Sequence, residues 1–187
     1  MSVKYIDIDA LRLSQMYLSQ KKIANVLTWF APTLYHFEPI LVHDISGDGN
    51  LHITDGHTRT FVAWRHGLRQ IPYIYDEDEV VTCAIGKRLY GESVVWCNRF
   101  GLNHISSLAG RILTEDDYDL FWLGRCDKMH NLQIALFDGT LRFDELRLKK
   151  ENLAQQGLLI YGISKDFSTI YSENELGELF ETAYATV

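Results

Sequence analysis

The stretch Asp55-Gly56-His57-Thr58-Arg59 brings an acid, a base, a hydroxyl and a permanent cation within five residues. The glycine can adopt a positive φ and lets a ligand approach the backbone closely. An arginine guanidinium binds phosphate through two parallel hydrogen bonds and stays charged at physiological pH. These residue types at this spacing predict a site for an anion, and phosphate is the anion that they match best.

Two residues of this stretch could move protons. A histidine exchanges a proton near neutral pH, and an aspartate can orient it, accept a hydroxyl proton or bind Mg²⁺. We therefore name Asp55 and His57 as candidate catalytic residues. The candidate cofactor-binding residues are Gly56, His57, Thr58 and Arg59.

The elements around this stretch would present it to a ligand. Residues 50–54 alternate between polar and apolar types and predict a strand, and residues 60–66 predict a short helix. The glycine then lies at a strand-to-helix junction. Backbone N–H groups are unpaired there, and the helix dipole favours negative charge.

Each of these side chains also has a purely structural alternative. Arg59 could pair with one of the many acids of the chain, and His57 could be a turn histidine bonded to the backbone. Asp55 could cap the turn that the glycine begins. Thr58 could be the N-cap of the following helix, a role that needs no ligand.

No metal ligands are predicted from the remaining histidines, because they lack a spacing such as H-E-x-x-H; they are His43, His52, His66, His104 and His130. Mg²⁺ would enter with the phosphates, and the acids at 76–79 either form a solvated turn or help to hold it. Residues 44–55 approach the spacing of a calcium loop, but their flanks predict strands, which favours a plain hairpin turn.

The patterns along the chain predict an α+β fold. Strands are expected at 3–8, 38–43 and 71–75 besides 50–54, and helices at 19–30, 88–100, 105–108 and from 114 to about 130. A turn at 137–140 between short strands, a helix at 143–155, a hairpin at 158–171 and a helix at 173–185 follow. This divides the chain into a mixed-sheet domain 1–80, a helical extension 81–130 and a small α+β appendage 131–187.

Composition narrows the class of protein. The chain has 187 residues and a formal net charge of −7, whereas a surface that holds duplex DNA should be basic. We therefore expect no tight DNA binding. The three cysteines form no C-x-x-C pair and predict free thiols, no signal sequence is evident, and no apolar run is long enough for a membrane span. These features predict a cytoplasmic protein.

The motif Asp55-Gly56-His57-x-Arg59-x-x-x-Ala63, with Glu-Pro-Ile-Leu-Val at 38–42 upstream and Gly-x-x-x-Ile-Pro at 67–72 downstream, resembles the ParB/sulfiredoxin-like superfamily. The resemblance covers residues 3 to 76. It implies a ParB/sulfiredoxin-like mixed sheet and a G-x-x-R turn that binds nucleotide phosphates. The motifs at 14–19, 55–59 and 122–126 are similar to a group of bacterial ParB-like proteins without an assigned activity.

The chain departs from each characterised branch of this superfamily. Sulfiredoxins have a catalytic cysteine directly after the glycine, where this chain has His57, so we expect no sulfiredoxin activity. ParB proteins have G-E-R-R and a helix-turn-helix, and residues 87–130 offer no basic recognition face. Free-serine kinases have the similar turn Asp-Gly-His-His-Arg but use an early glutamate as base, and residues 13–15 contain no carboxylate.

Two functions are consistent with the sequence. The first is a phosphotransferase or nucleotidase that binds a nucleoside phosphate (ATP, ADP or CTP) with Mg²⁺ and uses Asp55 or His57 on the acceptor. The second is a non-catalytic, nucleotide-gated module whose C-terminal helices hold a protein or nucleic-acid partner or a second copy of the chain. The acceptor, the nucleotide and the oligomeric state stay open.

Overall fold

The computed structural model describes residues 4–30 and 37–139. The chain falls into two units, Met1–Trp122 and Leu123–Val187, whereas the sequence-based division placed boundaries near residues 80 and 130. The described part mixes strands and helices, so the α+β expectation is confirmed. The elements expected beyond residue 139 lie outside the described residues.

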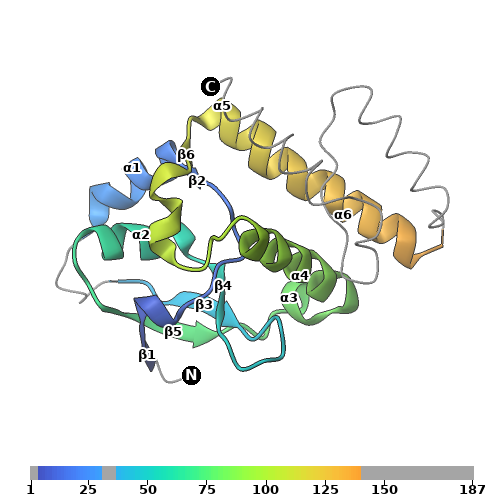
Figure 1. Ribbon diagram of the computed structural model, residues 1–187, viewed down its shortest axis with the longest axis horizontal. Coiled ribbons are helices and arrows are strands. Elements are labelled where there is room, and N and C mark those ends of the chain that lie inside the picture. The colour runs from blue at the N-terminus through green and yellow to red at the C-terminus, as the bar shows by residue number, and fades with distance from the viewer. Residues whose placement is uncertain (1–3, 31–36, 140–187) are drawn as a thin grey trace. The chain divides into compact units, whose positions relative to one another are not determined.

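The first unit contains a mixed four-stranded sheet (Figure 1). Its strands are β1 (Lys4–Asp7), β3 (Ile40–His43), β4 (His52–Asp55) and β5 (Gln70–Tyr75), in the order β1-β5-β3-β4. β3 runs parallel to β5, and the other two pairings are antiparallel. All four strands overlap the ranges predicted from the sequence, 3–8, 38–43, 50–54 and 71–75.

Helices and short elements complete the described chain. They are η1 (Ile8–Ala10), β2 (Leu18–Ser19), α1 (Gln20–Trp29), α2 (His57–Arg65), α3 (Glu79–Thr82), α4 (Ala84–Arg99), η2 (Ile105–Gly110), β6 (Ile112–Leu113), α5 (Glu115–Tyr118), the π-helical turn η3 (Asp119–Leu123) and α6 (Gly124–Phe137). The short strand expected before residue 137 is wrong, because α6 runs through Phe137.

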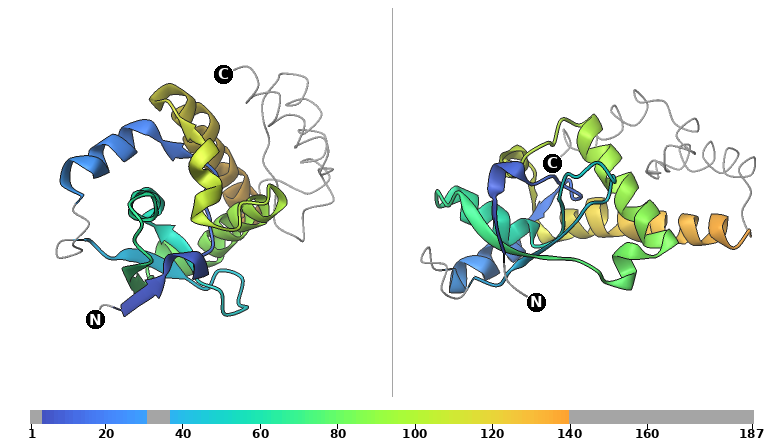
Figure 2. Two further views of the ribbon diagram at one scale, coloured as in Figure 1. Left: turned by 60° about the vertical axis from the view of Figure 1, so that its left-hand side comes forward. Right: turned by 90° about the horizontal axis from the view of Figure 1, so that it is seen from below.

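The core of the first unit forms where α2 packs on the sheet (Figure 2). Phe61, Val62 and Ala63 of α2 are buried, and so are strand residues such as Ile40 and Ile53. Burying such side chains contributes about 1.5–3 kcal/mol each. This packing holds α2 and its first turn against the end of β4.

Helix α1 begins at the predicted N-cap: the Ser19 hydroxyl accepts a hydrogen bond from the Lys22 N–H at 3.2 Å. Its predicted apolar core stripe is only partly correct. Val26 is buried, Ile23 and Phe30 are half-buried, and Leu27 is 50% exposed. The helical spacing therefore predicted a wider buried face of α1 than the structure has.

The hairpin between β3 and β4 turns around Asp44. Its carboxylate accepts the backbone N–H groups of Gly47, Asp48 and Gly49 at 2.8, 3.2 and 2.9 Å. The carboxylate thus organises the turn itself. This geometry is that of the plain hairpin turn that the flanking strands predicted.

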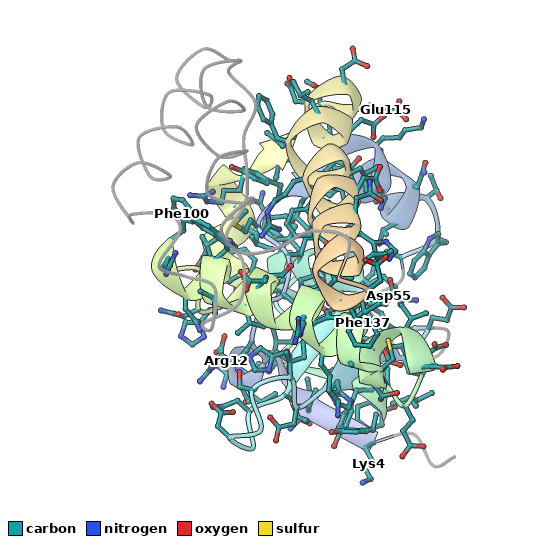
Figure 3. The ribbon with its side chains drawn as sticks, turned by 90° about the vertical axis from the view of Figure 1, so that its right-hand side faces the viewer. Lys4, Arg12, Asp55, Phe100, Glu115 and Phe137 are labelled. Carbon is teal, nitrogen blue, oxygen red and sulfur yellow. The ribbon has the colours of Figure 1, made fainter. Side chains whose placement is uncertain are left out.

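Residues 111–118 brace α1 from a distant part of the sequence. β2 pairs with β6 in parallel, so α1 and α5 start side by side from one two-stranded ladder. Lys21 of α1 forms an ion pair with Glu115 of α5, and Glu115 is labelled in Figure 3. The position of α1 in the first unit is therefore fixed by residues 112–115, which lie well beyond position 80.

We predict that Gly56→Ala destabilises the protein by about 2 kcal/mol or more. Gly56 has φ +105°, and an added Cβ would lie 2.6 Å from Ile40 Cγ2. Both the backbone strain and the steric overlap oppose the substitution. Urea unfolding of the variant and the wild type measures the difference.

Gly67→Ala is the matched control. Gly67 also has a positive φ, +79°, but an added Cβ would meet nothing within 4 Å. It should cost only the backbone strain, about 1 kcal/mol. Equal losses for the two variants would mean that the contact with Ile40 is not restrictive.

A candidate anion site at the start of helix α2

Gly56 makes the turn from β4 into α2. It adopts the left-handed conformation, with φ 105° and ψ 15°, and is the N-cap residue. Helix α2 begins at His57 rather than at residue 60, so Thr58 lies inside the first turn and the prediction of an N-cap at Thr58 is wrong. The early start places the backbone of residues 57–59 in helical geometry.

The first turn of α2 offers backbone N–H groups to a ligand. The first N–H groups of a helix have no partner within the helix, and the helix dipole places partial positive charge there. Among the described residues, no side chain caps this end of α2. The arrangement suits an anion that accepts these hydrogen bonds.

A cavity of about 330 Å³ opens at this helix start. Residues 55–59 form one part of its lining, and Gln15, Lys22, Asn25 and Val26 form the other. The volume lies at the lower end of the range for ligand pockets. The structure thus brings all the predicted site residues to a single cavity.

The α1 residues of the second part of the lining were missed as site residues from the sequence, whereas Gln15 falls in the motif at 14–19. Lys22, Asn25 and Val26 lie three and four residues apart, which puts them on one helix face. A lysine and an asparagine on a surface helix resemble ordinary solvent-exposed positions. Only the proximity of α1 to α2 shows that this face borders the glycine turn.

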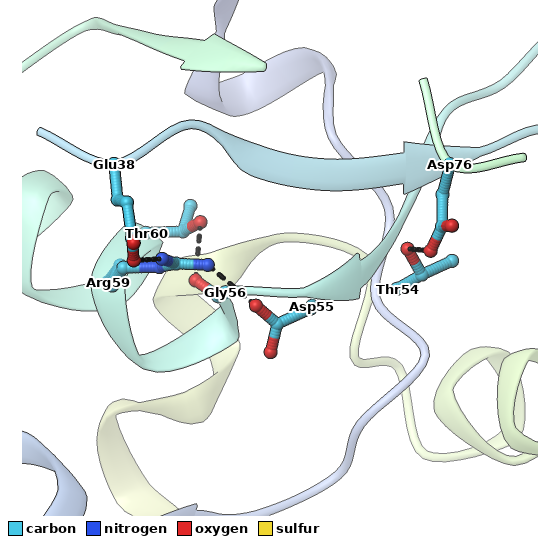
Figure 4. A network of polar contacts seen from close by, with 7 residues as sticks. All are labelled: Glu38, Thr54, Asp55, Gly56, Arg59, Thr60 and Asp76. Atoms are coloured by element: carbon cyan, nitrogen blue, oxygen red, sulfur yellow. Dashed lines mark hydrogen bonds and ion pairs between the residues drawn. The ribbon is translucent and has the colours of Figure 1, made fainter. Parts of the chain in front are cut away.

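Arg59 is held between two carboxylates (Figure 4). Its Nη1 donates to Glu38 Oε2 and its Nη2 to Asp55 Oδ2, both at 2.6 Å. The ion pair that the sequence left open is therefore present. Both carboxylates are well exposed, at 79% and 68%, while the Arg59 side chain is only 13% exposed.

These ion pairs are open to competition. Exposed pairs contribute about 0–1 kcal/mol, since water screens them and the side chains lose freedom. A phosphate that also accepts backbone N–H groups could displace one carboxylate from the guanidinium. Arg59 therefore neutralises local acids in the free protein and is still placed to contact an anion.

His57 is buried at the base of the turn. Its Nε2 accepts the Ser14 N–H at 3.2 Å, so this nitrogen carries no proton. Burial lowers the pKa of His57 to about 3. The side chain is a neutral histidine that ties α2 to the segment before β2, and this geometry gives no support to the expected acid–base role.

Lys22 supplies a cation to the cavity. Its Nζ lies 3.4 Å from the Tyr118 hydroxyl and 5.0 Å from the centroid of that ring. The same hydroxyl accepts a hydrogen bond from Gln15 Nε2 at 3.2 Å. Two polar side chains of the lining therefore converge on one tyrosine.

The acids at 76–79 do not all face solvent as expected. Asp76 is buried, and its carboxylate accepts hydrogen bonds from the Thr54 hydroxyl at 2.5 Å and the Asp78 N–H at 3.1 Å. Figure 4 shows this pair apart from Arg59. Asp76 is thus engaged in the fold and is not positioned beside the glycine turn.

No three potential metal-ligating residues gather among the described residues. Asp55 is the carboxylate that lines the cavity. Mg²⁺ commonly needs only one or two carboxylates in addition to phosphate oxygens and water. The donors fit a Mg²⁺ ion brought by a phosphate ligand and do not form a protein-only metal cage.

No protein-family model matches the chain, and no curated protein shows significant sequence similarity to it. Within the described ranges, none of the helices has both the length and the apolar character needed to cross a membrane. Among the described residues, Cys83, Cys97 and Cys126 form no disulfide with one another. Since the comparisons name no relative, the function is inferred from the cavity and the residues that line it.

We predict that the protein loses stability as the pH falls below about 6.5. Folding lowers the pKa of His57 to about 3, so below pH 6.5 the unfolded chain binds a proton that the folded chain does not. The unfolding free energy should then fall by up to about 1.4 kcal/mol per pH unit from this residue. Burial also lowers the pKa of His52, which adds to the slope.

His57→Gln tests the assignment, because its amide oxygen can still accept the Ser14 N–H. Urea unfolding between pH 7 and pH 5 should show a shallower pH dependence for this variant than for the wild type. His104→Gln is the control, since His104 is exposed. An unchanged slope for His57→Gln would mean that His57 binds its proton equally well in the folded and unfolded chains, and that burial does not lower its pKa.

Proposed function

We propose that the protein binds a nucleoside phosphate, with the phosphates at the first turn of α2 and facing Lys22. The observation that carries this proposal is the uncapped start of α2 opening into a cavity that Lys22 also lines. Backbone N–H groups, an ammonium group and a displaceable guanidinium together match the oxygens of a phosphate chain. ATP, ADP and CTP are the ligands to test first.

We also propose that the first unit has a ParB/sulfiredoxin-like fold. The mixed sheet and the strand–turn–helix passage with Gly56 and Arg59 agree with the motif resemblance. His57 stands in the place of the sulfiredoxin cysteine, so the proposal excludes sulfinic-acid reduction. The resemblance supports the nucleotide as the class of ligand.

The geometry favours ligand binding without turnover over catalysis. The Nε2 lone pair of His57 is occupied, and its low pKa keeps it neutral. A protein that binds a nucleotide and responds by changing its contacts would need no general base. Such a module could hold a protein partner or a second copy of the chain.

Phosphoryl transfer is the second candidate, and the exposed carboxylate of Asp55 on the cavity lining favours it. Asp55 would accept the proton of an acceptor hydroxyl, while Lys22 and the first turn of α2 hold the phosphates. Mg²⁺ would be held by phosphate oxygens, water and Asp55, and when bound it would neutralise phosphate charge.

We predict that Lys22→Met lowers the affinity for the nucleotide about tenfold to a hundredfold, because a charge-assisted hydrogen bond contributes about 1.5–3 kcal/mol. Isothermal titration with ATP, ADP and CTP, with and without Mg²⁺, measures the affinity of wild type and variant.

Lys21→Met is the matched control. It removes the neighbouring positive charge, which pairs with Glu115 and does not line the cavity. Its affinity should stay within about threefold of wild type, since an exposed charge outside the site acts only through screened attraction. Equal affinity of Lys22→Met and wild type would remove Lys22 from the site, and no binding by the wild type would refute the proposed function.

Asp55→Asn separates the two candidate functions. The substitution removes a competitor for the Arg59 guanidinium, so in the absence of Mg²⁺ the nucleotide affinity should be equal to or greater than that of wild type. If Asp55 is a general base, turnover should fall by roughly 10²–10⁴. Single-turnover assays beside the titrations measure both quantities, and a loss of affinity would show that Asp55 contacts the ligand or its metal directly.

A further inference from the structure

Tyr118 lies outside the motif that defines the site, yet it contacts two side chains that line the cavity. It is the last residue of α5 and is 3% exposed. Among the described residues, Tyr118 is not one that lines the cavity itself. Its hydroxyl accepts from Gln15 Nε2 at 3.2 Å and from Lys22 Nζ at 3.4 Å.

We propose that Tyr118 is a positioning residue for the phosphate ligand: its hydroxyl and ring hold the Lys22 ammonium at the cavity. This inference rests on the proposed function. The ring centroid lies 5.0 Å from Lys22 Nζ, within the range of a cation–π contact. Tyr118 therefore attracts the ammonium group through two features, and because it does not line the cavity, it would act on the ligand through the lining side chains it contacts, first of all Lys22.

The energetic reason lies in the freedom of a lysine side chain. A lysine on a helix surface has many rotamers, and a ligand that fixes it must offset the lost entropy. A tyrosine that already restricts Lys22 reduces this cost before the ligand arrives.

Tyr118 can do this because α5 is itself fixed relative to α1. The Thr114 hydroxyl caps α5 by accepting the Asp117 N–H at 3.3 Å. The ladder between β2 and β6 joins the starts of the two helices. Lys22 thus contacts a tyrosine whose position is fixed by residues 112–118.

A double-mutant cycle with inorganic pyrophosphate as the probe tests the inference. Pyrophosphate is the unit common to ATP, ADP and CTP. Tyr118→Phe keeps the buried ring and loses the hydroxyl, so it should fold and should weaken pyrophosphate binding about threefold to tenfold. Tyr118→Leu also loses the ring and should weaken it further.

The background without the lysine gives the decisive comparison. In Lys22→Met, adding Tyr118→Phe should change the affinity less than twofold, because the tyrosine has no ammonium left to position. Thermal melting of each variant checks the fold. An equal loss in both backgrounds, or full affinity of Tyr118→Phe and Tyr118→Leu, would overturn the positioning role.

The proposed function can fail separately. If the wild type binds pyrophosphate and Lys22→Met weakens that binding, the proposed phosphate site is supported. The double-mutant cycle then tests only the role of Tyr118. If the wild type binds neither pyrophosphate nor any of the three nucleotides, the phosphate site is refuted and the role of Tyr118 is refuted with it.

Discussion

The contact between Gly56 and Ile40 determines how closely α2 approaches the sheet. A side chain at position 56 would overlap Ile40 Cγ2, so the β4–α2 turn can sit at this depth only with a glycine. This close approach of α2 to the sheet buries the apolar side of the helix. The first turn of α2 and Lys22 then line the same cavity.

A buried polar contact holds the same turn from the other side. Ser14 donates its N–H to His57, and its hydroxyl donates to the Ile53 carbonyl at 2.6 Å. A buried unpaired N–H would cost about 1–3 kcal/mol. A neutral histidine accepts the Ser14 N–H without burying a charge. The residue that seemed most suited to chemistry therefore serves the fold, and the exposed groups around it are left to meet a ligand.

The sequence was most informative where structure is local. Alternation and short apolar runs predicted the four strands of the main sheet, Ser19 marked the start of α1, and the glycine turn was recognised by type and spacing. These features depend on neighbours in sequence. The ion pair of Arg59 with Asp55 was foreseeable as an alternative because the two residues are four apart, across the start of a helix.

The sequence was least informative where distant segments meet. Lys22 and Asn25 had no sign of a site role in the sequence, and only the fold brings them beside the glycine turn. Burial of Asp76 was hidden within a run of acids that suggested solvent. Each case depends on a tertiary neighbour that no local pattern encodes.

The division of the cavity between two segments has an evolutionary consequence. The glycine turn is tightly constrained by packing, whereas the face of α1 that carries Lys22, Asn25 and Val26 borders the cavity without filling the main core, apart from Val26. Substitutions at Lys22 and Asn25 could therefore accumulate without unfolding the chain. A lineage built on this scaffold could keep its phosphate-binding turn and exchange the chemical group recognised beside it, so proteins with the same turn need not share a ligand.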